Sequence, residues 1–509
     1  MLRVTLVMML ASGAAFAAER PRLGVLIVVD QLSAEAFRAR LPKATGGFKR
    51  MTQEGLVFHE LRFESAPTIT STGHATIVTG AYPHRHGIAS NDWLDAATGK
   101  PSLSSQDARY TVLGREPRSR DGTAPTFLQV PTLSDAVRGH HDAAKAVAIS
   151  SKDRSSILTA GQAGLGVWFD AEKPFFTTST FYAKELPAWT KPVNERIAKM
   201  VLSGAFAWGL PGGGTTGESP TLPRETRQGD SEPLVERPEL QPLLDTAQVD
   251  LALDAVKALE LGKDDVPDLL TISFSGHDRI GHEFGPDSAE GLKEFLHVDQ
   301  ELGRLFAGLD AAVGKGRYVV ALTSDHGVAT LPELAQQRGL DAGHVDTRGL
   351  LAKLEAELDT ALGKADWFAG YKTPGFTFAP GQKAKAMKSF DRLRALAKLE
   401  PGVWDLFASW QLPEGTLGDL YRRGLVEGRS PDLIVVTKPH WTYGLKDHTG
   451  HASPWLYDRA VPLVLWGAGV KKGQAGDAEA IDVAPTLSRL MGVPTPAGAE
   501  GHALDVVFR

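Results

Sequence analysis

The chain has 509 residues, of which 42% are hydrophobic and 23% charged, as is usual for a globular protein with a large core. Its formal net charge of -6 gives no indication of a basic surface for nucleic acid. Cysteine is absent, which excludes disulfide bonds and thiolate ligands and leaves His, Asp, Glu and hydroxyl groups for any metal site.

The first residues have the pattern of a secretory signal peptide. Arg3 supplies a positive charge, an apolar stretch spans residues 4–11, and Ala15-Phe16-Ala17 fits a cleavage site. The apolar stretch is too short to cross a bilayer, and no later run of about 18 apolar residues occurs. We expect residues 1–17 to be removed, leaving a soluble protein without a membrane partner in the periplasm or outside the cell.

Short apolar runs without strict alternation predict strands that are buried on both faces. Helical patterns, for example at 246–259 and 289–312, lie between these runs. The alternation predicts a doubly wound, mostly parallel α/β sheet flanked by helices, with ligands bound at the carboxyl ends of the strands. The runs occupy residues 25–29, 146–149, 269–272, 318–322, 433–436 and 463–465.

Two stretches predict insertions into a single catalytic domain spanning residues 18–509. The stretch near 205–240 is rich in Gly, Pro, Thr and charged residues, which predicts a long loop. The stretch 347–428 has helical segments and fewer strand runs, and we expect it to form a cap or subdomain over the site.

The segment Pro67 to Thr76 places a hydroxyl group at the start of a predicted helix. The pattern turns helical after Thr70, and Gly80 suits the C-cap. The helix N-terminus favours a phosphoryl group because of its free N–H groups and dipole. Taken alone, Thr70 is more typical of an N-cap, since a Thr hydroxyl is a poor nucleophile until a metal lowers its pKa.

Six residues that can bind a metal lie almost entirely at predicted strand ends. Asp278 and His282 are four residues apart, so on a helix they share one face. Nitrogen and oxygen ligands without sulfur suit a catalytic zinc, and six ligands plus a hydroxyl suit two ions. The six residues are Asp30, Asp278, His282, Asp325, His326 and His451.

Together these motifs resemble the alkaline phosphatase superfamily over nearly the whole mature chain. The sequence is most similar to nucleotide pyrophosphatase/phosphodiesterases and to bacterial alkaline phosphatases with a Thr nucleophile. The motifs are Asp30, T-x-x-G-H at Thr70, Tyr82-Pro83 to His86-Gly87-Ile88, Asn91-Asp92-Trp93, D-x-x-x-H-x-x-G-P from Asp278 to Pro286, Ser324-Asp325-His326-Gly327, and Asp482 to Leu487.

The resemblance implies two zinc ions with separate ligands. One is held by Asp278, His282 and His451, and the other by Asp30, Thr70, Asp325 and His326. His451 is preferred to His448 because the stretch His451-Ala452-Ser453-Pro454-Trp455 resembles the family's H-G-S-P-aromatic pattern, with Ala452 in place of the usual Gly.

Lys152 and Arg154 follow the run 146–149, and the family's Thr-type monoesterases have such a pair at the matching strand end. Cationic donors favour a monoester over a diester, because a monoester has an extra negative charge. We therefore expect Lys152, Arg154 and Asn91 to contact the phosphate. Sulfatases share the fold, but they use a C/S-x-P-x-R motif that does not surround Thr70.

The sequence thus predicts an alkaline phosphatase that hydrolyses phosphate monoesters, with broad leaving-group tolerance, through a Thr70 phosphoenzyme at alkaline pH. Its ligands are small phosphate monoesters and inorganic phosphate, and a monomer is expected. Two alternatives stay open: a two-zinc type I phosphodiesterase or nucleotide pyrophosphatase, and a secreted zinc- or phosphate-binding protein without enzymatic activity.

Overall fold

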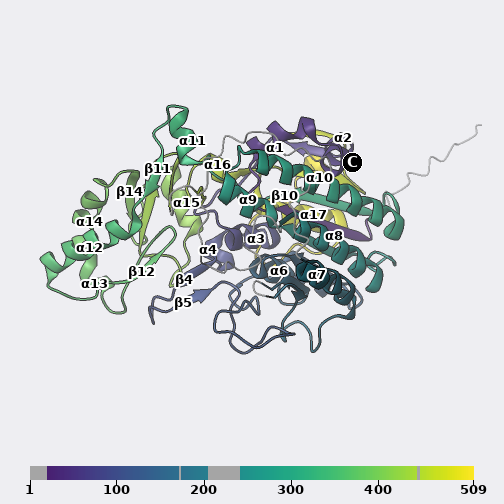
Figure 1. The fold of residues 1–509 in the computed structure, drawn as a ribbon, viewed down its shortest axis with the longest axis horizontal. Coiled ribbons are helices and arrows are strands. Elements are labelled where there is room, and N and C mark those ends of the chain that lie inside the picture. The colour runs from purple at the N-terminus through teal and green to yellow at the C-terminus, as the bar shows by residue number, and fades with distance from the viewer. Residues whose placement is uncertain (1–19, 171–172, 204–240, 444–447, 509) are drawn as a thin grey trace, which may run out of the picture.

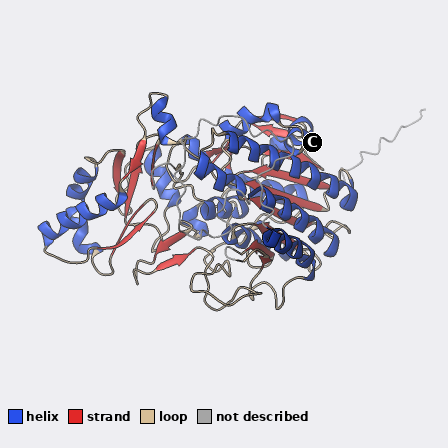
Figure 2. Ribbon diagram, in the orientation of Figure 1, coloured by secondary structure: helices blue, strands red, loops and turns tan. Residues whose placement is uncertain are grey.

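A computed structural model describes residues 20–170, 173–203, 241–443 and 448–508. Its centre is a nine-stranded sheet with the order β19-β2-β18-β10-β1-β9-β6-β7-β8, packed between two layers of helices (Figures 1 and 2). The inner strands β1 (Leu23–Val29), β6 (Ala146–Ser150), β9 (Asp268–Phe274) and β10 (Tyr318–Thr323) run parallel. The predicted doubly wound α/β sheet is confirmed.

Strand β1 shows why its sequence lacks polar alternation. All seven of its residues are buried, and alternate side chains enter different cores. Val25 and Ile27 pack with α8 (Gln241–Ala258) and α10 (Ala289–Leu309), while Leu26 packs with α3 (Thr70–Thr79) and α17 (Val483–Met491). A strand covered on both faces needs apolar residues at every position.

Two predicted parallel strands are placed differently by the structure. The run 463–465 falls in β18 (Val464–Gly467), which joins the central sheet but lies antiparallel to β10. The run 433–436 is β15 (Leu433–Thr437), which lies outside the central sheet and pairs antiparallel with β13 (Gly375–Phe378) and β14 (Val403–Ala408). An apolar run specifies burial, and its direction and neighbours depend on the connections around it.

The predicted insertion at 347–428 forms most of a second body with its own core. Its four-stranded sheet has the order β12-β13-β15-β14, with β12 spanning Phe368–Lys372. The helices α12 (Thr347–Leu362) and α14 (Phe390–Ala397) pack on it through Leu354 and Leu393. This body lies at the left of Figure 1, beside the strands β4 (Asp92–Leu94) and β5 (Pro101–Leu103).

Two sequence predictions lie outside the described residues. These are the signal peptide at 1–17 and the loop insertion near 205–240. In the described ranges, none of the helices combines the length and apolar character needed to cross a membrane.

The Tyr82–Ile88 segment is fastened to α3 by a buried histidine. His86 ends α4 (Pro83–His86), and its Nδ1 accepts a hydrogen bond from the N–H of Ile88 at 3.1 Å. Its Nε2 therefore donates to the Thr76 hydroxyl oxygen at 3.1 Å. Burial, together with the nearby His84, lowers the pKa of His86 to about 3. The folded structure therefore stabilises the neutral form of the His86 ring.

We predict that His86→Gln flattens the acid side of the stability profile. The pKa of His86 is lower in the folded state than its ordinary value of 6.5. Its contribution to the free energy of unfolding is therefore complete above pH 6.5 and is lost as the pH falls toward 3. The loss approaches about 1.4 kcal/mol per pH unit. Glutamine can replace both hydrogen bonds without titrating. Denaturant unfolding of both proteins between pH 7 and 4 measures the difference, and parallel profiles would contradict the prediction.

Candidate active site

The predicted site residues gather at the carboxyl ends of four adjacent parallel strands. Asp30 follows β1, Lys152 follows β6, and Asp325 and His326 follow β10. Asp278 and His282 lie on α9 (Gly276–Phe284), the helix that follows β9. Neighbouring parallel strands end at the same sheet edge, so chain segments far apart in sequence meet there.

Thr70 is the first residue of the fully buried helix α3, and Gly80 ends that helix in the left-handed conformation, as predicted. The N-cap position belongs to Ile69, while the Asn91 side-chain oxygen accepts a hydrogen bond from the N–H of Ser71 at 2.9 Å. The Thr70 hydroxyl is therefore not used as the helix cap. A Cβ at Gly73 would collide with the Asp325 carbonyl oxygen, so this glycine lets α3 lie against the loop that contains Asp325 and His326.

Three oxygen donors surround one nitrogen of His326. Its Nε2 lies 3.4 Å from the Thr70 Oγ1, 3.5 Å from an Asp30 oxygen and 3.5 Å from an Asp325 oxygen. Zinc bonds of about 2.1 Å in a tetrahedral arrangement separate the donors by about 3.4 Å. The Asp30 Oδ1 is buried and accepts no hydrogen bond from the described residues. The ligand atoms of Asp30, Asp278 and His326 lie within 4.8 Å of one another and could hold a metal ion, and Asp325 and Thr70 adjoin this set at the His326 Nε2.

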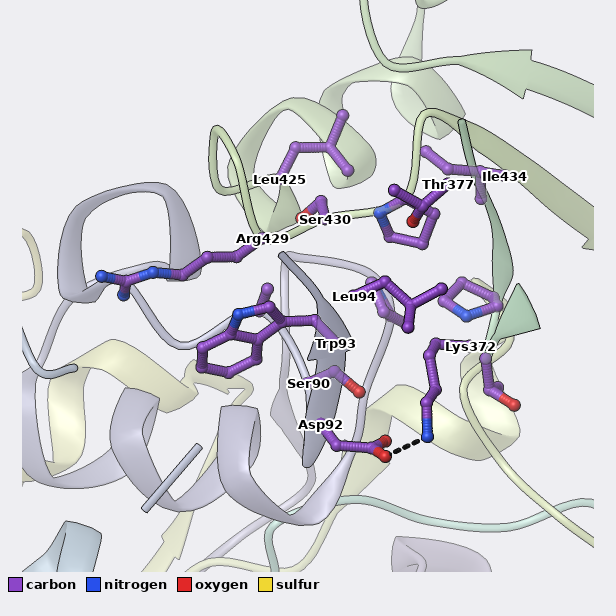
Figure 3. A pocket seen from close by; sticks show the side chains of 15 residues that line it. Ser90, Asp92, Trp93, Leu94, Lys372, Thr377, Leu425, Arg429, Ser430 and Ile434 are labelled. Atoms are coloured by element: carbon purple, nitrogen blue, oxygen red, sulfur yellow. Dashed lines mark hydrogen bonds and ion pairs between the residues drawn. The ribbon is translucent and has the colours of Figure 1, made fainter. Parts of the chain in front are cut away.

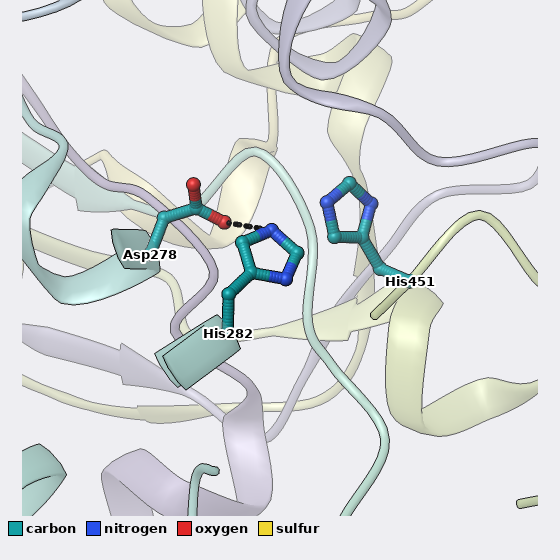
Figure 4. Close-up of side chains that lie close together, drawn as sticks. All are labelled: Asp278, His282 and His451. Atoms are coloured by element: carbon teal, nitrogen blue, oxygen red, sulfur yellow. Dashed lines mark ion pairs between the residues drawn. The ribbon is translucent and has the colours of Figure 1, made fainter. Parts of the chain in front are cut away.

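A second group consists of Asp278, His282 and His451, shown in Figure 4. The His282 Nε2 lies 3.1 Å from an Asp278 oxygen, and the ligand atoms of all three residues lie within 4.8 Å of one another. Asp278 also groups with Asp30 and His326, so it lies between the two sets. His448 is not part of these groups; its ring lies 3.5 Å from Glu283.

All three histidines present Nε2 to the site because a backbone carbonyl fixes the other nitrogen. The Nδ1 atoms of His282, His326 and His451 lie 2.7, 3.0 and 2.9 Å from the carbonyl oxygens of Thr449, Gly327 and Thr68. A carbonyl only accepts hydrogen bonds, so each Nδ1 bears a proton, and in the neutral ring it is Nε2 that has the lone pair for a metal. This arrangement orients histidine ligands of metals.

The site concentrates negative charge that is out of contact with water. Asp30, Asp278 and Asp325 are each at most 2% exposed. Burial and the neighbouring Asp325 raise the pKa of Asp30. Burial opposes ionisation of Asp278 as well, but His282 and Lys152 outweigh it and hold its pKa well below the usual range. Three close carboxylates thus favour the binding of cations.

Lys152 lies among the candidate metal ligands. Its ammonium group donates to Asp30 at 2.6 Å and to Asp278 at 2.5 Å, and so links a member of each group. Arg154 is in the first turn of α6 (Asp153–Ala160), where its buried Nε has no hydrogen-bond partner among the described residues. Its guanidinium lies 3.8 Å from the adjacent Asp153. The structure therefore places Lys152 in the cluster and leaves donors of Arg154 available.

Sequence reasoning missed the roles of two buried residues. His74, inside the T-x-x-G-H motif, contacts the Thr70 carbonyl oxygen at 2.8 Å and an Asp325 oxygen at 3.2 Å. Gln31 donates to carboxylates from both groups. The motif was a signal for His74. For Gln31 the only signal was its position after Asp30.

Ala452 has a positive φ of 81° and is almost completely buried. This left-handed conformation favours glycine, which is consistent with the glycine that the family pattern has at this position. The preceding His451 stacks on His326, with ring centroids 3.7 Å apart. This chain therefore has an alanine in a left-handed conformation next to a ring of one group that stacks on a ring of the other.

A pocket lies beside Asn91, between the central domain and the inserted sheet (Figure 3). Ser90 and Asp92, which flank Asn91, line it together with Lys372 and Arg429. Lys372 on β12 forms an ion pair with Asp92. The insertion therefore contacts the segment that caps the Thr70 helix.

Comparisons with known proteins agree with this arrangement. A family described as type I phosphodiesterase / nucleotide pyrophosphatase matches residues 24–460. The alkaline phosphatase PafA of Elizabethkingia meningoseptica is 30% identical, with 97% of this chain and 95% of that protein covered. The alkaline phosphatase PhoV of Synechococcus elongatus is 27% identical, with 96% and 93% covered. The crystal structure of wild-type PafA has a TM-score of 0.83 at 30% identity, covering 97% of this chain and all of that one.

The shared fold and the site define an enzyme that hydrolyses phosphoesters. The chain belongs to the type I phosphodiesterase / nucleotide pyrophosphatase family and is a phosphatase. The resemblance inferred from the motifs is confirmed, as is the expectation of an enzyme.

Proposed function

We propose that the protein is an alkaline phosphatase that hydrolyses phosphate monoesters, with broad leaving-group tolerance, through a phosphothreonine at Thr70. The observation that supports this most directly is the position of the Thr70 hydroxyl, 3.4 Å from the His326 Nε2 and outside the helix-capping role. A buried hydroxyl beside potential metal ligands is suited to act as a nucleophile.

The proposal includes two zinc ions. One would be held by Asp278, His282 and His451, and the other by Asp30, Thr70, Asp325 and His326. When bound, such ions lower the pKa of a coordinated hydroxyl or water and stabilise negative charge on a leaving oxygen. Within this frame, the Thr70 oxygen attacks phosphorus in line with the leaving group, and water later releases phosphate from Thr70. Activity should rise into mildly alkaline pH because the Thr70 hydroxyl must lose its proton.

Asn91 has a geometry suited to orienting the phosphate. Its side-chain oxygen is occupied by the N–H of Ser71, so its amide nitrogen is the group left to donate hydrogen bonds. Arg154 has a buried Nε that is available for an anion. Asn91 is held beside Thr70 by its bond to Ser71, and we propose that Arg154 supplies a second donor to the phosphate from α6, because positioning and charge stabilisation dominate phosphoryl transfer.

The charge balance favours a monoester. The positive charges of two divalent cations and Lys152 would exceed the negative charges of the three carboxylates by two. The negative charge of an ionised Thr70 would be cancelled by the positive charge of Arg154. This excess matches a monoester dianion better than a diester monoanion. One solved variant of PafA has substitutions of a Thr, an Asn, and a Lys and an Arg two positions apart. The same residue types occur here in that order as Thr70, Asn91, Lys152 and Arg154.

A type I phosphodiesterase or nucleotide pyrophosphatase is the second candidate, because the matching family has that description. For the whole chain we propose a signal peptide at 1–17 and one catalytic domain at 18–509, with insertions near 205–240 and 347–428. We propose that the protein is secreted to the periplasm or the outside of the cell and that it is a monomer. Its ligands would be small phosphate monoesters and inorganic phosphate.

Thr70→Ala should abolish turnover while leaving the metal content largely unchanged, because the other ligands remain. Hydrolysis of p-nitrophenyl phosphate and elemental analysis of the same preparation provide the two measurements. Thr70→Ser is the matched control, since it keeps a hydroxyl group and should keep measurable activity. Full activity of Thr70→Ala would refute the nucleophile assignment.

Replacing both Lys152 and Arg154 by Ala should reduce monoester hydrolysis far more than diester hydrolysis. The two cations are proposed to interact with the extra charge of the monoester, and losing each such contact costs about 10- to 100-fold. The values of kcat/KM for p-nitrophenyl phosphate and bis-p-nitrophenyl phosphate test this. Equal losses would remove the pair from substrate discrimination.

A further inference from the structure

Gln31 has an unusual conformation at the centre of the site. It follows Asp30, is 1% exposed, and has a φ of 68°. A residue with a side chain rarely occupies this left-handed region, at a cost of about 1–2 kcal/mol. The surrounding contacts must therefore hold Gln31 in place.

Those contacts join the two candidate metal groups. The main-chain N–H of Gln31 donates to the Asp325 Oδ1 at 3.1 Å, and the side-chain Nε2 donates to the Asp278 Oδ1 at 2.7 Å. A carboxylate only accepts hydrogen bonds here, so the amide must present its nitrogen to Asp278. The same Asp278 oxygen lies 3.1 Å from the His282 Nε2.

The rest of the amide fits a space left by a glycine. The Gln31 Oε1 is buried and accepts no hydrogen bond within the described part of the chain. It faces Gly281 on α9, where a Cβ would collide with it. A buried amide oxygen without a partner costs free energy. The local packing therefore keeps Gln31 in this orientation at the expense of one unsatisfied oxygen.

We propose that Gln31 is a positioning residue that orients one carboxylate of each metal group. Its side chain directs the Asp278 oxygen toward His282, and its peptide N–H fixes Asp325 beside His326. This inference rests on the proposed pair of metal sites. Because every substitution except proline keeps the N–H, loss of the side chain should affect the Asp278 group selectively.

The test is a zinc titration of metal-depleted protein by calorimetry, with wild type, Gln31→Met and Gln31→Gly. Both variants remove the amide donor, but only glycine also relieves the backbone strain. One of the two zinc equivalents should bind about 10- to 100-fold more weakly in both variants, while the other is unchanged. Thermal unfolding of the depleted proteins shows whether each variant is folded.

Gln162→Met is the matched control. The Gln162 amide donates to the Pro125 carbonyl oxygen at 3.2 Å, beyond the end of α6 opposite Lys152, so this change should leave both affinities unaltered. In a His451→Ala background the Asp278 group is already impaired. Adding Gln31→Met there should change the affinity of the remaining equivalent by less than about twofold.

The possible results separate the inference from the proposed function. If wild type binds two zinc equivalents and Gln31→Met and Gln31→Gly bind both like wild type, Gln31 is not a positioning residue. Equal weakening of both equivalents would also overturn the inference, because it indicates a general structural effect. If wild type itself binds fewer than two equivalents, the proposed two-zinc function fails.

Discussion

Three buried carboxylates at one edge of the central sheet are the constraint on which the site depends. Asp30, Asp278 and Asp325 follow three different strands and are buried. Among the described residues, Lys152 supplies the one ammonium group within hydrogen-bond distance, and it contacts Asp30 and Asp278. Such an excess of buried charge is unfavourable unless cations or further donors compensate it. The main-chain N–H of Gln31 is one such donor, because it donates a hydrogen bond to Asp325. The Nε2 atoms of the histidines face the same site, where they could bind a cation.

The same constraint explains the presence of glycines and the placement of backbone groups that have no reactive side chain. Gly73 permits α3 to lie against the Asp325 backbone, which brings Thr70 to His326. Gly281 leaves room for the Gln31 amide. Carbonyl oxygens of Thr68, Gly327 and Thr449 determine which nitrogen of each histidine faces the site. Function here depends on close backbone packing as much as on the polar residues.

Much of this arrangement could be predicted from the sequence. Continuous apolar runs predicted β1, β6, β9 and β10, and the polar residues after them were expected to lie together because parallel strands end at one sheet edge, as they do. The roles of these residues came from the family resemblance and stay predictions. The direction of β18 and the sheet of β15 could not be predicted, because an apolar run contains no information about its partner. Gln31 was missed because its contacts depend on a left-handed backbone and on Gly281, 250 positions away in sequence.

Whether Thr70 becomes covalently phosphorylated tests the central claim most directly. Enzyme mixed with a phosphate monoester and quenched rapidly in acid should contain phosphate on the peptide that includes Thr70, as detected by mass spectrometry. The proposed route predicts one phosphoryl group on the Thr70 oxygen. Steady turnover without any covalent phosphate, or phosphate on a different residue, would contradict it.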